Sequence, residues 1–247
     1  MSNKMLRVHS IETFGTHEGP GIRLVLFLQG CPLHCLYCHN VDTQAREGEG
    51  SALYSSAQIV AMLDRQRPFF SRGGGLTVSG GEATLQADAV HELFTEAKAA
   101  GFHVTLDTSG ILYSEEVNRL YDLADLVILD VKHINDTWHR KLTGGGNANV
   151  LRNAAYREQS GKPLWLRYVL VPGWTDQPEY VAAWAEHFAG YATVERVEIL
   201  PYHTLGVHKY AVLGRPYVLA DVQPPSAEQV ERVRETFARH LRNVVVV

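Results

Sequence analysis

Short apolar runs alternate with segments of helical periodicity along most of the chain. The apolar runs predict strands at residues 22–29, 76–79, 102–106, 126–131, 164–171, 194–200 and 244–247. Apolar residues three and four positions apart predict helices that start after Ser55, around residues 90–97, at 115–121, 137–142, 150–158 and 178–188, and after Ser226. The strand at 126–131 is almost unbroken in its apolar character, which is typical of a buried parallel sheet.

Two of the predicted helices carry a clear start signal. Ser55 is followed three positions later by Gln58, and Ser226 is followed in the same way by Gln229. This spacing forms a capping box, in which each of the two side chains bonds to the other residue's backbone N–H. We therefore expect helices to begin directly after both serines.

The alternation amounts to about six β/α units and predicts an α/β fold with right-handed crossovers. Six units are fewer than the eight of a closed barrel, so both an open partial barrel and a doubly wound sheet fit the pattern. No repeat or linker divides the chain, and we expect residues 1–247 to form a single domain. The polar, glycine-rich residues 42–51 are expected to form a mobile loop.

Composition narrows the function classes. The 247 residues include 23 basic and 27 acidic side chains, for a net charge of −4. That charge gives no electrostatic reason to expect nucleic acid or an anionic membrane as partner. No apolar run is long enough to span a bilayer, and the N-terminus lacks the apolar core of a signal peptide. We therefore expect a cytoplasmic enzyme.

All three cysteines of the chain fall within eight residues. Cys31, Cys35 and Cys38 have the spacing C-x3-C-x2-C. An odd number in one tight group argues against a disulfide framework. A structural zinc site and a protein-held iron–sulfur cubane both need four ligands, so three thiolates would leave one iron of a cubane open to another molecule. His34 and His39 flank the cysteines, and a Cys3His zinc site is the alternative reading.

A second group of polar residues lies at the ends of the predicted strands, where ligands of β/α folds bind, except for Arg167, which lies within the fifth strand. The group consists of Gly80, Gly81, Glu82, Asp107, Thr108, Asp130, Lys132, Arg167 and His203. Together they could hold a polar, zwitterionic ligand. Each also has a structural reading, because glycines make turns, aspartates cap turns, Lys132 could be solvated, Arg167 could pair with a structural carboxylate and His203 could be a satisfied structural histidine.

These motifs resemble those of one enzyme family. The cysteine motif with Tyr37 resembles that of the radical S-adenosylmethionine (SAM) superfamily, and Gly80-Gly81-Glu82 looks like its GGE motif. The wider set is similar to the pyruvate formate-lyase-activating enzyme family, from about residue 7 to the C-terminus. That set comprises residues 15–23, 29–31, 37–40, 79–83, 106–110, 129–132, 167–169 and 200–203.

The resemblance implies a partial (β/α)6 barrel of radical SAM type, open on one side, with a 4Fe–4S cluster and SAM as cofactors. Cys31, Cys35 and Cys38 would hold three irons, and SAM would chelate the fourth. The implied SAM contacts are Tyr37, Cys38, His39, Gly80, Gly81, Glu82, Asp130, Val131, Lys132, Arg167 and His203. Asp107, Thr108, Ile128 and Asp130 match the ligands of a monovalent cation (sodium or potassium) in the family. Glu18 stands where the family usually has Asp.

The activity implied by the resemblance is reductive cleavage of SAM. The resulting 5′-deoxyadenosyl radical would abstract hydrogen from a glycine of pyruvate formate-lyase, with flavodoxin as the expected electron donor. Activases with an inserted ferredoxin-like domain need further cysteines, which this chain lacks. The alternatives are an activase of another glycyl radical enzyme, a radical SAM enzyme for a small molecule, and a zinc-binding interaction module.

Overall fold

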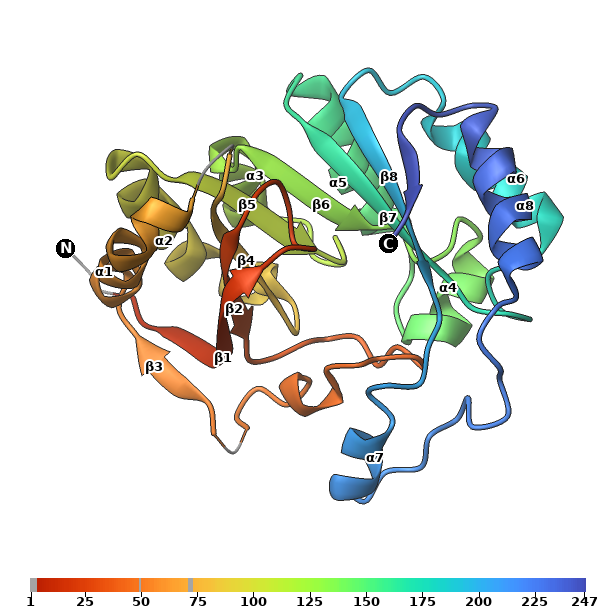
Figure 1. Cartoon of the computed structure of the whole chain (residues 1–247), viewed down its shortest axis with the longest axis horizontal. Helices are drawn as coiled ribbons and strands as arrows, with labels where there is room; N and C mark the ends of the chain where they lie inside the picture. The colour runs from red at the N-terminus through yellow and green to blue at the C-terminus, as the bar shows by residue number, and fades with distance from the viewer. Residues whose placement is uncertain (1–3, 49, 71–72) are drawn as a thin grey trace. The chain divides into compact units, whose positions relative to one another are not determined.

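The computed structural model describes residues 4–48, 50–70 and 73–247 (Figure 1). The chain falls into two compact units. Unit 1 holds the chain up to Pro32 together with Asp42–Thr108 and Leu112–Ile128, and unit 2 holds Leu33–Val41, Ser109–Ile111 and Leu129–Val247. The predicted site residues are therefore divided between the two units, and each unit is described by itself.

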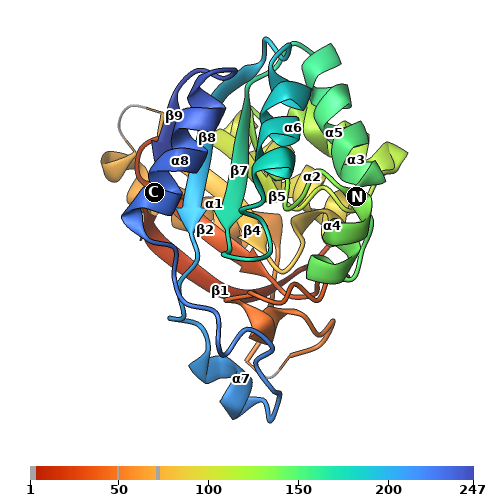
Figure 2. The same cartoon turned by 90° about the vertical axis from the view of Figure 1, so that its right-hand side faces the viewer.

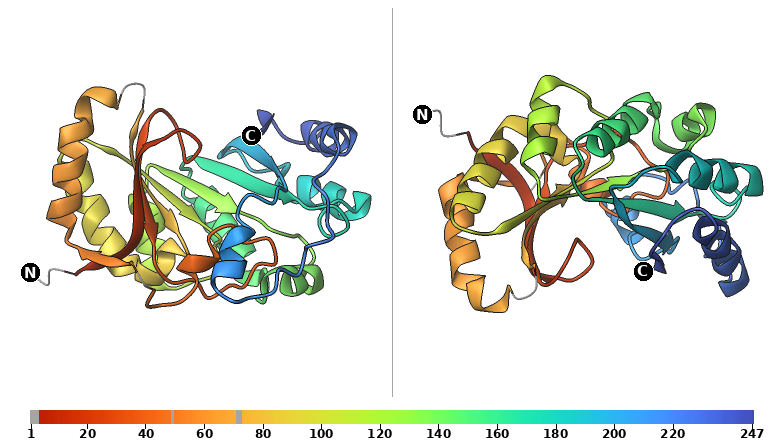
Figure 3. Two further views of the ribbon diagram at one scale, coloured as in Figure 1. Left: turned by 60° about the horizontal axis from the view of Figure 1, so that its bottom comes forward. Right: turned by 90° about the horizontal axis from the view of Figure 1, so that it is seen from above.

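Unit 1 is built on a sheet with a parallel centre. Its strands are β1 (Leu6–Gly15), β2 (Arg23–Leu28), β3 (Ala52–Tyr54), β4 (Gly75–Gly80) and β5 (His103–Thr108). The β2, β4 and β5 strands pair in parallel, whereas β1 is antiparallel to both β2 and β3. The helices are α1 (Ser56–Gln66), α2 (Ala87–Ala99) and α3 (Glu115–Leu123), which lie side by side (Figure 3).

The helices of unit 1 follow the predicted periodicity. The capping box at Ser55 is formed, with the Ser55 side chain accepting a hydrogen bond from the Gln58 backbone N–H. In α2 the four apolar residues that predicted the helix, Val90, Leu93, Phe94 and Ala97, are completely buried. Burying one such side chain is worth roughly 1.5–3 kcal/mol for the larger residues, so this face holds α2 against the sheet.

Unit 2 contains a second set of parallel strands. They are β7 (Leu164–Leu170), β8 (Val194–Pro201) and β9 (Val244–Val246), with β7–β8 and β8–β9 paired in parallel. The helices are α4 (Asp136–Thr143), α5 (Ala148–Gln159), α6 (Pro178–Phe188), α7 (His208–Val212) and α8 (Ala227–Ala238). Figure 2 shows α6 and α8 on the viewer's side of β7 and β8.

Three aromatic side chains form the centre of the unit 2 core. The rings of Trp184 and Phe237 are stacked with centroids 4.6 Å apart, and Tyr168 meets both edge-on at 5.5 and 5.1 Å. Trp184 and Phe237 come from α6 and α8, and Tyr168 comes from β7. Aromatic contacts of this kind add about 0.5–1.5 kcal/mol each to the burial of their area. They fasten both helices to the strand.

The strand order confirms the predicted fold class. Hydrogen-bonded neighbours follow the order β3-β1-β2-β4-β5-β6-β7-β8-β9, in which β6 is Leu126–Asp130. The order begins and ends at edge strands, so the sheet of this α/β fold is not closed. Every predicted strand is present, and β9 is an edge strand as expected.

Several details differ from the sequence prediction. The β1, β3 and α7 elements were not predicted, and Asp107 and Thr108 lie inside β5 rather than beyond it. The expected loop at 42–51 overlaps a short 3-10 helix, η1 (Val41–Thr43), and Thr43 and Gln44 are buried. Leu241 is buried although it lies beyond the end of α8.

Candidate functional site

The segment that carries Cys35 and Cys38 is held by backbone hydrogen bonds in unit 2. The N–H of His34 donates to the carbonyl of Thr143 at 2.8 Å, and the N–H of Leu36 donates to Leu142 at 2.9 Å. Both acceptors lie in the last turn of α4, whose carbonyl groups have no partner within the helix. The cysteine segment thus completes the end of α4.

The three cysteines have different surroundings. All are unbridged; Cys35 is buried, while Cys31 and Cys38 are half-buried. The Cys38 N–H donates to the Cys35 carbonyl at 3.1 Å, which forms a turn between these two thiols. In unit 1 the Cys31 N–H donates to the carbonyl of Gln44 at 3.1 Å. Burial raises the pKa of the Cys35 thiol to about 12, although the Lys132 charge partly opposes this shift.

Buried Lys132 and half-buried Asp130 form an ion pair beside Tyr37. Lys132 Nζ donates to Asp130 Oδ2 at 2.9 Å and lies 5.6 Å from the centre of the Tyr37 ring. Burial alone would lower the pKa of Lys132, but the Asp130 carboxylate keeps it well above its usual value. Among the described residues, Asp130 Oδ1 is buried and has no hydrogen-bond partner, as is also true of the Tyr37 hydroxyl. The reading of Lys132 as a solvated side chain was wrong.

Val131 and Arg167 already have protein partners. The Val131 N–H donates to the Arg167 carbonyl, and the Val131 carbonyl accepts from Trp184 Nε1, both at 3.1 Å. Arg167 Nη2 lies 3.0 Å from Glu198 Oε2, and the Glu198 carboxylate is almost fully buried. Arg167 thus has the structural carboxylate that its place in an apolar strand suggested.

His39 and His203 lie against each other in unit 2. Their ring centres are 4.1 Å apart, and His39 Nε2 lies 2.9 Å from the His203 carbonyl oxygen. Burial lowers the pKa of His39, so its neutral form is favoured. Neutral His39 can donate its Nε2 proton to that carbonyl. The pair brings together two predicted SAM contacts that are 164 residues apart in the sequence.

In unit 1, one oxygen of Glu82 collects three hydrogen bonds. Glu82 Oε1 accepts from the Thr84 N–H at 3.0 Å, from Thr84 Oγ1 at 2.6 Å and from Thr108 Oγ1 at 2.6 Å. The residue is 1% exposed and caps the 3-10 helix η3 (Ala83–Gln86). Two predicted site residues, Glu82 from the end of β4 and Thr108 from β5, are thereby joined.

Gly80 has a structural reason to be glycine. Its φ is +116°, and a Cβ atom there would lie 2.0 Å from the backbone nitrogen of Leu28 on β2. The next residue, Gly81, donates its N–H to the Leu28 carbonyl at 2.9 Å. A side chain at position 80 would push β4 away from β2, so the tight-turn reading of this glycine is correct whatever else it contacts.

The remaining unit 1 residues are buried strand positions or their neighbours. Asp107 is buried and accepts from Ser79 Oγ at 3.0 Å, and Ile128 is completely buried in β6. The Glu18 carbonyl accepts from Thr77 Oγ1 at 2.6 Å, and its side chain accepts from the His17 N–H at 3.2 Å. The carboxylate of Asp107 and the carbonyls of Thr108 and Ile128 are oxygen donors of the kind that hard cations prefer.

Sequence reasoning missed one residue that touches the cysteine segment. Tyr210, on α7, donates its hydroxyl to the Cys38 carbonyl at 3.0 Å. The two residues are 172 positions apart, and no motif spacing connects them. Their contact was not predictable from the local sequence.

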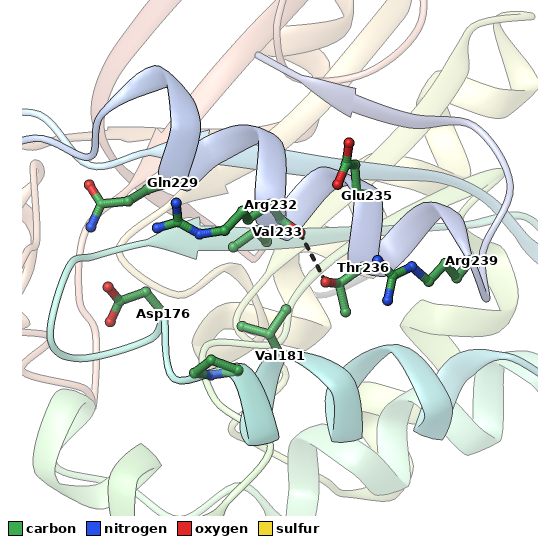
Figure 4. A pocket seen from close by; sticks show the side chains of 9 residues that line it. Asp176, Val181, Gln229, Arg232, Val233, Glu235, Thr236 and Arg239 are labelled. Atoms are coloured by element: carbon green, nitrogen blue, oxygen red, sulfur yellow. Dashed lines mark hydrogen bonds between the residues drawn. The ribbon is translucent and has the colours of Figure 1, made fainter.

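Unit 2 also has a cavity of about 330 Å³, which is lined by other residues. It is lined by α6, α8 and the turn before α6, including Asp176, Val181, Arg232 and Arg239 (Figure 4). None of the predicted site residues lines it.

Comparison with known proteins gives a consistent result. The family model of the radical SAM superfamily matches residues 25–185. The pyruvate formate-lyase-activating enzyme of Streptococcus mutans is 43% identical over 96% of this chain and 94% of that protein. The pyruvate formate-lyase 1-activating enzyme of Escherichia coli K12 is 41% identical over 97% of this chain and 98% of its own.

The chain belongs to the pyruvate formate-lyase-activating enzyme family of the radical SAM superfamily.

Solved structures support the fold of this radical SAM enzyme. A domain of a pyruvate formate-lyase-activating enzyme from Bacteroides vulgatus matches with a TM-score of 0.60 at 22% identity, over 71% of this chain and 99% of the other. Streptococcus suis SuiB bound to its precursor peptide SuiA matches with a TM-score of 0.70 at 17% identity, over 97% of this chain and 50% of SuiB.

Membership of the radical SAM superfamily implies a 4Fe–4S cluster and SAM. Among the described residues, no group of three His, Cys, Asp or Glu side chains is arranged so that it could hold a metal ion. The chemistry of the donor set suits a cluster, because Cys31, Cys35 and Cys38 are three unbridged thiols within eight residues. The buried Asp130 Oδ1 without a partner fits a ligand that supplies a hydrogen-bond donor or a cation. In the part of the chain that the structure describes, no helix has both the length and the apolar character needed to cross a membrane.

Proposed function

We propose that this protein activates pyruvate formate-lyase by generating a glycyl radical on it. The observation that carries the proposal is 41–43% identity, over nearly the whole chain, to proteins that bear this activating function in their names. Cys31, Cys35 and Cys38 hold the 4Fe–4S cluster. When bound, the cluster and SAM supply the radical chemistry, in which SAM is reductively cleaved and a hydrogen atom is removed from a glycine.

The residues of unit 2 bind and orient SAM in this proposal. Lys132 holds Asp130 through its Oδ2 atom, and Asp130 Oδ1 would then be placed to accept a hydrogen bond from the cofactor. His39 and His203 supply a pair of rings in contact, tilted by 36°, and Tyr37 lies beside the lysine in the core. Val131 fixes the backbone beside Asp130 and Lys132, because its N–H and its carbonyl are both hydrogen-bonded within the protein. Arg167 is a positioning residue that acts through its ion pair with Glu198.

The residues of unit 1 have a supporting role. Gly80, Gly81 and Glu82 form the rigid end of β4, which receives the methionine end of SAM. Glu82 is fixed by its three hydrogen bonds and therefore loses little freedom when a ligand binds. Asp107, Thr108, Ile128 and Asp130 would be the ligands of a monovalent cation in this proposal. Their oxygen donors are suited to sodium or potassium.

The cellular setting forms part of the same proposal. Flavodoxin supplies the electron, and the protein works in the cytoplasm, where it would encounter a glycyl radical enzyme.

Residues 1–247 act as one radical SAM domain. Unfolding of the two units in a single cooperative transition, followed by circular dichroism and by tryptophan fluorescence, is the expected behaviour of one domain.

The test is anaerobic incubation with SAM, a chemical reductant and pyruvate formate-lyase, read by electron paramagnetic resonance. A glycyl radical should form, and deuterium from α-deuterated glycine in the partner should appear in 5′-deoxyadenosine. The matched control is the Cys38→Ala variant, which should form no radical. If no deuterium is transferred while a free metabolite supports stoichiometric SAM cleavage, the enzyme acts on a small molecule instead.

A further inference from the structure

Four exposed apolar side chains lie in the segment that follows β8. Leu205 is 78% exposed, Val212 83%, Leu213 46% and Val218 65%. They fall within residues 204–218, which include α7, and we name this segment the α7 platform. Single exposed apolar residues are ordinary, but four of them in one short segment make that segment a candidate interaction surface.

The opposite side of the α7 platform is fastened to the cysteine segment. Tyr210 is buried and donates its hydroxyl to the Cys38 carbonyl at 3.0 Å. Gly206 approaches His39 so closely that a Cβ atom at position 206 would lie 2.8 Å from the His39 Cα. The exposed residues are therefore carried by a segment whose buried side contacts the residues around Cys38.

Further tyrosines hold the platform in place. The hydroxyl oxygens of Tyr202 and Tyr217 are 2.7 Å apart, and the Tyr217 ring meets the Tyr210 ring edge-on at 4.9 Å. Figures 1 and 2 show α7 extending beyond the end of β8, away from β7 and β9. The platform is thus anchored by its inner side chains while its outer face is left to solvent in this chain.

The charge of the platform differs from that of the whole protein. Residues 204–218 contain His208, Lys209 and Arg215 but no Asp or Glu, in a chain whose net charge is −4. Such a local basic and apolar surface is complementary to a face that combines apolar side chains with carboxylates. Complementary charge also speeds the encounter with a large partner.

We propose that the α7 platform is the docking surface for the protein substrate, whose matching face is apolar and acidic. The inference rests on the proposed function, because a glycine within a large protein must be brought to the cysteine segment. The α7 platform is anchored at Cys38 and His39. A substrate protein docked on the platform would therefore lie next to the cysteine segment. Binding energy from contacts away from the reacting glycine then positions the glycine loop.

The decisive variant is the double substitution Val212→Ser and Val218→Ser, which removes apolar contacts from two exposed positions. The rate of glycyl radical formation should be measured against the concentration of intact pyruvate formate-lyase, with a chemical reductant. The KM for the partner should rise by about tenfold or more, as for truncation of contacting interface residues, with little change in kcat. Leu53→Ser, at a 51% exposed position on β3 in unit 1, is the matched control and should behave as wild type.

Three further measurements make the result specific. Uncoupled SAM cleavage without partner, and turnover of a short peptide that copies the glycine loop, should be unchanged in the double variant. An unchanged KM for the intact partner overturns the docking proposal. A defect that appears with a protein electron donor but vanishes with the chemical reductant also overturns it, and assigns the platform to the donor. Failure of the wild-type enzyme to form any glycyl radical contradicts the proposed function instead.

Discussion

Lys132 Nζ lies 2.9 Å from Asp130 Oδ2 in a buried environment, while Asp130 Oδ1 has no partner among the described residues. The Lys132→Met variant leaves the Asp130 carboxylate without its cation. Removing one member of a fully buried pair costs about 3–5 kcal/mol. Because the Asp130 side chain is 21% exposed, we expect a smaller loss of stability, together with weaker SAM binding. Urea unfolding measures the first effect, and calorimetric titration with SAM measures the second.

A double variant separates the two roles. Lys132→Met combined with Asp130→Asn removes both charges, so much of the lost stability should return, whereas SAM affinity should stay low. If SAM affinity recovered together with stability, the Lys132–Asp130 pair would have only a structural role.

The buried thiol of Cys35 should react slowly before the cluster is loaded. Its pKa is about 12 because of burial, so very little thiolate exists at pH 8. Iodoacetamide labelling followed by peptide mass spectrometry should show Cys35 as the last of the three cysteines to be modified. Labelling in urea is the control, and there the three rates should converge. Equal rates in the folded protein would contradict the buried position.

Each cysteine should nonetheless be dispensable for folding. Cys31→Ala, Cys35→Ala and Cys38→Ala should each abolish SAM cleavage, because a missing thiolate leaves the cluster one ligand short. The thermal midpoint of the protein without iron should change little for the half-buried Cys31 and Cys38. Iron and sulfide analysis after anaerobic reconstitution checks the first claim. A variant that keeps both its cluster and its turnover contradicts the assignment.

Arg167 should matter for folding through Glu198. The Glu198 carboxylate contacts Arg167 at 3.0 Å and Arg196 at 2.9 Å, and it is 2% exposed. Arg167→Met leaves the more exposed Arg196 as the cation that contacts Glu198 among the described residues, so the free energy of unfolding should fall by about 2 kcal/mol. In a Glu198→Gln background, Arg167→Met should lower the free energy of unfolding by a smaller amount. An unchanged cost would mean that the two side chains are not energetically coupled.

Acid should destabilise the protein through His133. Burial lowers the pKa of His133 to about 4, below its ordinary value of 6.5, so the unfolded chain binds the proton more readily. The contribution of neutral His133 to the free energy of unfolding is therefore fully present above pH 6.5 and is lost as the pH falls towards 4. The total loss is about 3 kcal/mol at most. Urea unfolding at several pH values should show a shallower loss in His133→Gln. Parallel curves for both proteins would contradict the assignment.

The sequence predicted the parallel core well because its strands are buried on both faces. Residues 126–131 and 76–79 read as apolar runs, and both form strands. The β1 strand was missed because much of Leu6–Gly15 is exposed and polar, so the run lacks that signal. The three residues of β3 and the five of α7 are too short for periodicity to reveal.

The candidate site was predicted as a set of residues but not as a set of contacts. The motifs identified Glu82, Arg167 and Lys132, yet their partners depend on long-range folding. Glu198 lies 31 residues from Arg167, and Thr108 lies 26 residues from Glu82. No local pattern shows which carboxylate meets which cation, or that Lys132 is buried. Such pairings follow from strand register, which is set by the whole sheet.

The hydrogen bond from Tyr210 to the Cys38 carbonyl has a thermodynamic consequence. It joins the α7 platform to the turn that carries Cys38, which we propose as a cluster ligand. A substrate protein that shifts α7 would change the affinity of that turn for its cofactors. Linkage then requires that SAM and the cluster change the affinity for the substrate protein by the same factor. The affinity for the substrate protein and the affinity for the cofactors would then be coupled, so that a change in one is accompanied by an equal change in the other.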